Sequence, residues 1–139
     1  EGDVYQAGTL SGNPLATAAG MAVLSKLKSR EIYRRLERKR ELIADPLEAH
    51  IRDKRYPVTL QSLGSLFTLF FCQEAVTDYE GAKRASTAQY AKFFHELLSR
   101  GVFFPPSQFE TCFLSLAHSE DDLARTVQAV RESLERVFR

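Results

Sequence analysis

Two short segments carry residue types that could bind or transform a small molecule. The first, AGTLSGNPLA at residues 7–16, combines glycines, hydroxyl groups and backbone N–H groups just ahead of a predicted helix. Groups of this kind at a helix N-terminus can hold a phosphate. By composition alone, the pattern also fits a glycine-rich turn followed by a capped helix.

The second segment, PPSQFE at residues 105–110, places three polar side chains beside two prolines that restrict the backbone. Ser107, Gln108 and Glu110 could therefore face a ligand, and the alternative is a rigid connection at the surface. No local motif suggests a Ser-His-Asp or Cys-His catalytic arrangement, and no pair of carboxylates stands out.

The charge balance argues against nucleic acid or a membrane as a partner. The 19 basic and 18 acidic residues give a net charge of +1, which creates no strong field. No stretch approaches the roughly 20 apolar residues that span a bilayer, and the N-terminus lacks a signal segment. We therefore expect a cytoplasmic protein that binds small molecules or other protein surfaces. The abrupt start without Met suggests part of a longer chain.

The cysteines and histidines do not predict a metal site. Cys72 and Cys112 lie inside apolar runs, where burial as reduced thiols is expected. The three histidines, His50, His95 and His118, are not paired with them at short spacing, which a metal site would require.

The first half of the chain is predicted to be a loop followed by two helices. Residues 1–13 are rich in glycine, and Asn13 caps a helix over 14–28 that begins with proline. The small side chains of this helix imply close packing against a neighbouring element. A second helix begins at Ser29 with one apolar face, and Pro46 could kink or break it.

The second half is predicted to contain the sheet. Residues 58–73 are β-branched and aromatic around Gly64, which favours a hairpin or two successive strands. A turn at TDYEG precedes a helix near 84–100, whose aromatic stripe belongs to the core. A strand in TCFLSLA and a final helix capped by Ser119 complete an α+β pattern.

In four successive segments the chain resembles the glutamate-1-semialdehyde 2,1-aminomutase family, class III relatives of the aminotransferases. The segments are VYQAGTLSGNPLATAAG, GSLFTLFF, VTDYEGAKRAST followed by AKFFHELLSRGV, and PPSQFETCFLSLAHSEDDL. The resemblance implies a fold type I pyridoxal-phosphate enzyme whose C-terminal small domain packs helices on a short, mainly antiparallel sheet. Residues 1–13 would be the cofactor-phosphate loop at the end of the large domain, 14–28 a connecting helix and 29–139 the small domain. Residues 29–57 match least distinctively.

The resemblance also implies roles for individual residues. Gly8 and Thr9 match the pair that binds the phosphate of pyridoxal 5'-phosphate across a homodimer interface, so they would serve the partner subunit's cofactor. Glu110 matches a glutamate at the edge of the substrate pocket, and Ser107 and Gln108 would shape the same wall. The family's cofactor lysine lies upstream of the first motif, and none of the six lysines occupies its context. The isolated chain is therefore expected to be inactive.

The activity implied is conversion of glutamate-1-semialdehyde, a small amino-aldehyde, to 5-aminolevulinate in tetrapyrrole (porphyrin) biosynthesis. One alternative is a conventional class III aminotransferase, which often binds a substrate carboxylate through a C-terminal arginine. Residues 101–117 contain no arginine, which favours the aminomutase. The other alternative is a non-catalytic interaction domain derived from this fold.

Overall fold

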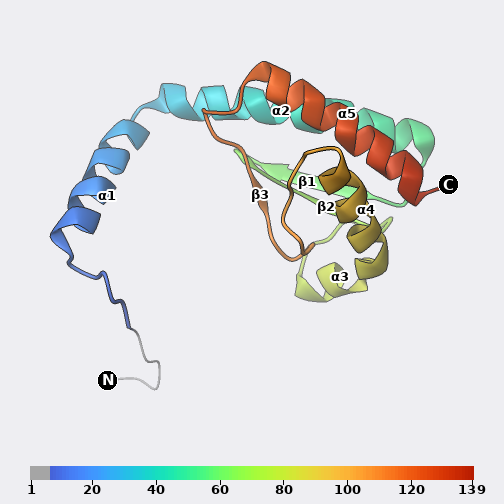
Figure 1. The fold of residues 1–139 in the computed structure, drawn as a ribbon, viewed down its shortest axis with the longest axis horizontal. Helices are drawn as coiled ribbons and strands as arrows, with labels where there is room; N and C mark the ends of the chain where they lie inside the picture. The colour runs from blue at the N-terminus through green and yellow to red at the C-terminus, as the bar shows by residue number, and fades with distance from the viewer. Residues whose placement is uncertain (1–6) are drawn as a thin grey trace. The chain divides into compact units, whose positions relative to one another are not determined.

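The computed structural model describes residues 7–139, and the chain divides into two units, Glu1–Ile32 and Tyr33–Arg139. Figure 1 shows the elements in chain order. They are α1 (Pro14–Leu27), α2 (Arg30–Lys54), β1 (Thr59–Leu63), β2 (Leu66–Phe70), α3 (Tyr79–Arg84), α4 (Thr87–Ser99), β3 (Cys112–Phe113) and α5 (Glu120–Val137).

The second unit is built on a three-stranded antiparallel sheet in the order β1-β2-β3. The predicted hairpin is confirmed: Leu63 pairs with Leu66, and the turn between them uses Gly64 at a φ of +58°. Glycine adopts this left-handed conformation without the steric cost that a Cβ brings. β3 pairs with β2 through Phe113 opposite Leu66 and Cys112 opposite Phe67. The α+β prediction with a short antiparallel sheet is therefore correct.

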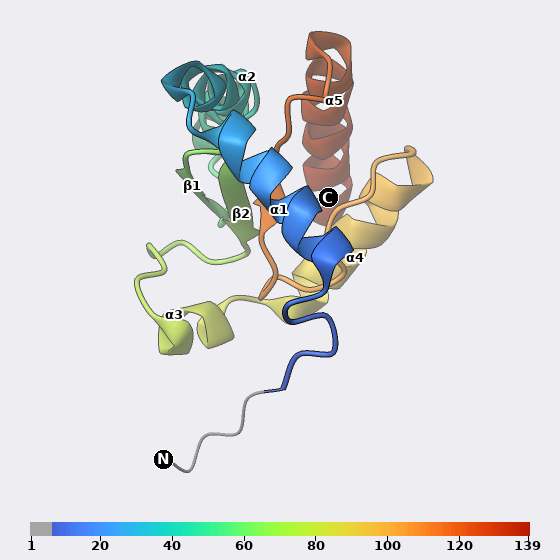
Figure 2. The same cartoon turned by 90° about the vertical axis from the view of Figure 1, so that its left-hand side faces the viewer.

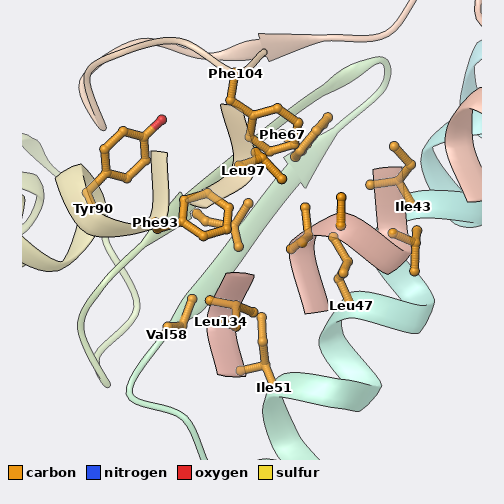
Figure 3. Close-up of a cluster of buried hydrophobic side chains, with 14 of the residues drawn as sticks. Ile43, Leu47, Ile51, Val58, Phe67, Tyr90, Phe93, Leu97, Phe104 and Leu134 are labelled. Carbon is orange, nitrogen blue, oxygen red and sulfur yellow. The ribbon is translucent and has the colours of Figure 1, made fainter. Parts of the chain in front are cut away.

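Helices cover one face of this sheet. β2 alternates, so that Phe67 and Leu69 are buried, whereas the other residues of the strand are only half-buried. In Figures 1 and 2, α2 and α5 lie on the same side of the sheet, and Figure 3 shows the apolar side chains that meet there. The helical core residues are Ile43, Leu47 and Ile51 from α2; Tyr90, Phe93 and Leu97 from α4; and Leu123, Val127, Ala129, Val130 and Leu134 from α5. The aromatic stripe predicted for the core is thus largely buried there.

The start of α5 is as expected. Ser119 accepts a hydrogen bond from the Asp122 N–H, and the Asp122 carboxylate accepts one from the Ser119 N–H at 2.9 Å. This capping box satisfies two backbone donors that would otherwise lack partners. It fixes where the last helix begins, next to the end of the short third strand.

The helix expected from Ser29 forms as α2, and the break left open at Pro46 does not occur. The Pro46 carbonyl accepts a hydrogen bond from Arg131 of α5 at 3.0 Å. The helix predicted near 84–100 starts only at Thr87, because Ser86 caps it. The segment TDYEG, predicted as a turn, instead leads into the separate helix α3, which begins where Asp78 accepts a hydrogen bond from the Gly81 N–H.

The predicted third strand and first helix also differ in detail. Pairing in TCFLSLA covers only Cys112–Phe113, because from Ser115 onward backbone N–H groups bond to nearby side chains: Ser115 donates to His118 Nδ1 and Ala117 to Ser115 Oγ. α1 forms where predicted, but none of its residues is buried. Its expected close packing is therefore not seen within residues 7–139.

Among residues 7–139, no helix is long and apolar enough to cross a bilayer. Cys72 and Cys112 are unpaired thiols, and both are half-buried rather than fully buried.

A buried ring nitrogen lies between α2 and α5. His50 Nε2 is inaccessible to solvent and has no hydrogen-bond partner, and the ring lies edge-on to Tyr56 at 5.7 Å. Burial lowers the pKa of His50 below its ordinary value of 6.5, and the Arg131 guanidinium lowers it further; Glu135 opposes this shift. The fold therefore favours the neutral imidazole.

This environment predicts a pH-dependent stability. Between the lowered folded pKa of His50 and its ordinary value of 6.5, the unfolded chain binds the proton and the folded chain does not. The free energy of unfolding should therefore fall as the pH drops from about 6.5 through the folded pKa, and level off below it. Urea unfolding between pH 5 and 7.5 measures this slope.

Substitution identifies the group responsible. His50→Gln should flatten the slope, whereas His95→Gln, a matched change at an exposed position on α4, should leave it intact. An unchanged slope in His50→Gln would show that another group causes it.

Candidate functional site

The first candidate segment forms a tight turn ahead of α1. The Ser11 N–H donates to the Gly8 carbonyl at 3.1 Å, and the Asn13 N–H donates to the Leu10 carbonyl at 3.0 Å. A Cβ built on Gly8 would lie 2.2 Å from Ser11 Oγ. The turn therefore depends on glycine at position 8 unless the Ser11 hydroxyl moves.

The first amides of α1 are already satisfied by the protein. Asn13 Oδ1 accepts hydrogen bonds from the N–H groups of Leu15 and Ala16, at 3.0 and 3.1 Å. A phosphate would therefore be held by the turn itself rather than by the capped helix end.

Thr9 is the residue of the turn best suited to a phosphate. It is exposed, and within residues 7–139 neither its N–H nor its hydroxyl makes a hydrogen bond. An amide and a hydroxyl are both donors that phosphate oxygens accept. Gly8, which precedes Thr9, carries no side chain to obstruct the approach, so the residues present fit the phosphate of the implied cofactor.

The second candidate segment is part of the loop that connects α4 to β3. It starts at Gly101, whose φ of +77° ends the helix. Within it, the Phe109 N–H donates to Ser107 Oγ at 3.2 Å and the Glu110 N–H donates to the Ser107 carbonyl at 3.1 Å. Ser107 thus closes the short turn that carries Glu110.

Glu110 is the exposed acid of this loop. Its carboxylate makes no hydrogen bond or ion pair to any residue in the described part of the chain. It lines a cavity of about 730 Å³ formed by the loop, β3 and the first turns of α5. A free carboxylate at a cavity wall is available to interact with a cationic ligand group.

Gln108 points the other way. It is 2% exposed, and its Nε2 donates to the carbonyls of Ala82 and Ala85 at 3.1 and 3.2 Å, at the end of α3. Its Oε1 has no hydrogen-bond partner. Neither Gln108 nor Ser107 lines the cavity that Glu110 lines, so their role in a substrate-pocket wall stays a prediction.

The loop has another buried attachment that its sequence does not reveal. The hydroxyl of Tyr90, on α4, donates to the Pro105 carbonyl at 2.7 Å. Figure 3 shows the Tyr90 ring at the edge of the labelled apolar cluster. Burial raises the pKa of Tyr90 well above its ordinary value, so the phenol stays protonated and remains a donor. Helical spacing predicted the ring's burial, but nothing local indicated the hydroxyl's partner.

The cavity also contains charged residues that the sequence analysis missed. Arg125 and His118 line it, from α5 and from the turn before that helix. His118 lies 8 and Arg125 lies 15 residues beyond Glu110 in the chain, so only the return of α5 past β3 brings them to one cavity. A guanidinium and a carboxylate on one wall could recognise a zwitterionic ligand.

Cys112 lines the same cavity but is unsuited to act as a nucleophile. Burial raises the pKa of its thiol to about 12, so the reactive thiolate is scarce near neutral pH. Among residues 7–139, no group of three or more His, Cys, Asp or Glu side chains could hold a metal ion.

The structure thus places the predicted site residues in two groups. Gly8 and Thr9 belong to the first unit, whereas Ser107, Gln108 and Glu110 share one loop of the second.

Comparisons with known proteins give the fold its context. No protein-family profile matches the chain. It is 43% identical to the glutamate-1-semialdehyde 2,1-aminomutase of Protochlamydia amoebophila and 45% identical to that of Thermomicrobium roseum, each over 99% of the chain. It is 48% identical to the enzyme of Anaeromyxobacter dehalogenans over 94% of the chain. The chain spans 30 to 32% of the length of these relatives.

Solved structures share the fold. An omega-transaminase from Sphaerobacter thermophilus matches 98% of the chain with a TM-score of 0.83 at 22% identity. A glutamate-1-semialdehyde aminomutase from Pseudomonas aeruginosa matches 99% with a TM-score of 0.81 at 21% identity. A β-phenylalanine aminotransferase from Variovorax paradoxus matches 95% with a TM-score of 0.74 at 26% identity. The chain corresponds to 30 to 31% of each of these proteins.

The fold is therefore that of the C-terminal small-domain region of the aminotransferase class, as the resemblance implied. Within that class, the chain is homologous to the C-terminal third of the glutamate-1-semialdehyde 2,1-aminomutases.

Removing the hydrogen bond between Tyr90 of α4 and the loop should lower the free energy of unfolding measurably. Tyr90→Phe keeps the buried ring but removes the donor to the Pro105 carbonyl, whose bond at 2.7 Å is then lost. The bond is part-buried, so its loss should cost about 0.5 to 1.5 kcal/mol of unfolding free energy. Tyr79→Phe makes the same change at a residue that is 68% exposed and should cost little. Equal stabilities of the two variants in chemical denaturation would show that the buried bond contributes nothing.

Proposed function

We propose that the chain is the C-terminal part of a pyridoxal-phosphate-dependent aminomutase that converts glutamate-1-semialdehyde to 5-aminolevulinate. The observation that carries the proposal is the 43 to 48% identity to curated enzymes of that name over at least 94% of the chain. We further propose that the complete enzyme is a cytoplasmic homodimer acting in porphyrin biosynthesis.

The rival proposal is a conventional class III aminotransferase, and the fold alone does not separate the two. A transaminase and an aminomutase match the structure with TM-scores of 0.83 and 0.81. The lack of arginine in residues 101–117 gives the aminomutase little support, because Arg125, which lies outside that range, lines the cavity from α5. The sequence identity to curated aminomutases therefore favours the aminomutase.

In the proposed enzyme, the first unit contributes to cofactor binding. The Thr9 hydroxyl and N–H donate to the cofactor phosphate, and the absence of a side chain at Gly8 leaves room for it. In the homodimer this cofactor belongs to the partner subunit. When bound, pyridoxal phosphate withdraws electron density from the reacting carbon and carries the amino group.

The second unit contributes Glu110 to the substrate pocket. A carboxylate near the substrate's amino groups favours their protonated, cationic forms. Glu110 thereby controls when each nitrogen has a free electron pair with which to react. The exposure of its carboxylate supports that role, because within residues 7–139 Glu110 forms no ion pair.

The phosphate role of Thr9 is tested by Thr9→Val in the complete enzyme. The substitution removes one charge-assisted donor at nearly constant volume, which should cost about 1.5 to 3 kcal/mol, or roughly tenfold or more in cofactor affinity. The rate of cofactor release, followed by absorbance, measures the effect. Thr17→Val, also an exposed threonine of the first unit, should leave the rate unchanged. Unaltered release in Thr9→Val would remove Thr9 from the phosphate site.

The role of Glu110 is tested by Glu110→Gln, which keeps the shape and removes the charge. We expect turnover to fall roughly tenfold or more and the balance between pyridoxal and pyridoxamine forms of the cofactor to change during reaction. Thermal stability should hardly change, because the carboxylate has no partner among the described residues. Rapid-scanning absorbance after mixing with substrate gives the comparison. Glu48→Gln, at an exposed position on α2, is the control, and a wild-type time course in Glu110→Gln would leave Glu110 a surface residue.

A further inference from the structure

The segment from Pro105 to Glu110 depends on side chains for its position. Pro105 and Pro106 have no N–H group, so this part of the loop cannot pair with a strand through their amides. It is attached instead by two buried hydrogen-bonding side chains. Tyr90 donates to the Pro105 carbonyl at 2.7 Å, and Gln108 donates to two carbonyls at the end of α3.

Gln108 is an energetically unfavourable residue to bury in the interior. Its Oε1 is buried without a partner, and burying a polar atom in this state is unfavourable. A methionine would fill a similar volume without that penalty. The Gln108 Nε2 donates hydrogen bonds to the carbonyls of both Ala82 and Ala85. These two bonds orient the backbone at position 108, which a methionine could not do.

This orientation extends to Glu110 through a short turn. Gln108 is the second residue of the turn that starts at Ser107, whose hydroxyl and carbonyl accept hydrogen bonds from the next two N–H groups after Gln108. Glu110 is thus two residues from a side chain that is 2% exposed. Beyond Glu110, the backbone enters β3 and pairs with β2. The Glu110 carboxylate therefore projects from a segment that is held on one side by Gln108 and on the other by the pairing of β3 with β2.

We propose that the two buried attachments of this loop, Gln108 above all and Tyr90 with it, are positioning residues for Glu110. The inference rests on the proposed function of Glu110 in the substrate pocket. Gln108 faces away from the cavity and acts through the backbone. A purely structural role, in which Gln108 only caps α3, predicts different behaviour when Glu110 is already disabled.

The experiment is a double-mutant cycle in the complete enzyme with Gln108→Met and Glu110→Gln. Gln108→Met should lower kcat by roughly tenfold, with a much smaller change in KM, when Glu110 is present. In the Glu110→Gln background it should lower kcat by less than twofold, because the group it positions is already missing. Gln128→Met makes the same chemical change on the exposed face of α5 and should be silent in both backgrounds.

Backbone amide hydrogen exchange supplies a readout independent of activity. The N–H groups of Phe109 and Glu110 are bonded to Ser107, and in Gln108→Met they should exchange severalfold faster. Exchange in α5 should be unaltered, which excludes general unfolding as the cause.

The results distinguish the positioning role of Gln108 from the proposed function of Glu110. Additive losses of kcat in the cycle, or unchanged exchange at Phe109 and Glu110, would overturn the positioning role while leaving the proposed function intact. A silent Glu110→Gln would overturn both. If Gln108→Met fails to fold, Tyr90→Phe releases the same loop at Pro105, and the same cycle with Glu110→Gln must show the same loss of effect for the inference to stand.

Discussion

The structure depends on the ring of Phe104, which inserts from the α4–β3 loop into the core of the second unit. Its centroid lies 5.5 Å from that of Phe67 on β2 and 6.1 Å from that of Phe93 on α4, and the ring is edge-on to both. The loop is thereby held against the helix-covered face of the sheet. Because Pro105 follows at once, the polar residues after it begin from a fixed point. The packing of these aromatic rings therefore fixes the position from which the segment carrying Glu110 starts.

Much of this framework could be predicted because its causes are local. The alternation in β2, the glycine at the hairpin and the capping box of α5 each follow from a few neighbouring residues. The aromatic stripe of α4 could be assigned to the core because helical spacing places Tyr90 and Phe93 on one face. The turn predicted at TDYEG was wrong, because Asp78 caps the separate helix α3 there.

The attachments of the site could not be predicted, because they join residues distant in the chain. Gln108 bonds carbonyls 23 and 26 residues away, and Tyr90 bonds one 15 residues away. Nothing in PPSQFE shows that its glutamine turns inward while its glutamate turns outward. Arg125 joins the cavity only because α5 returns past β3. Family resemblance suggested which residues matter, but only the tertiary fold distinguishes a residue that could touch a ligand from one that orients its neighbour.

In the proposed enzyme, this chain supplies part of the cofactor and substrate site but not the lysine that holds the cofactor covalently. Absorbance titration of residues 1–139 with pyridoxal phosphate tests it most directly. The account predicts weak, non-saturating reaction spread over the six lysines and no aminomutase activity. A saturable one-to-one absorbance change that substitution of a single lysine abolishes would contradict it.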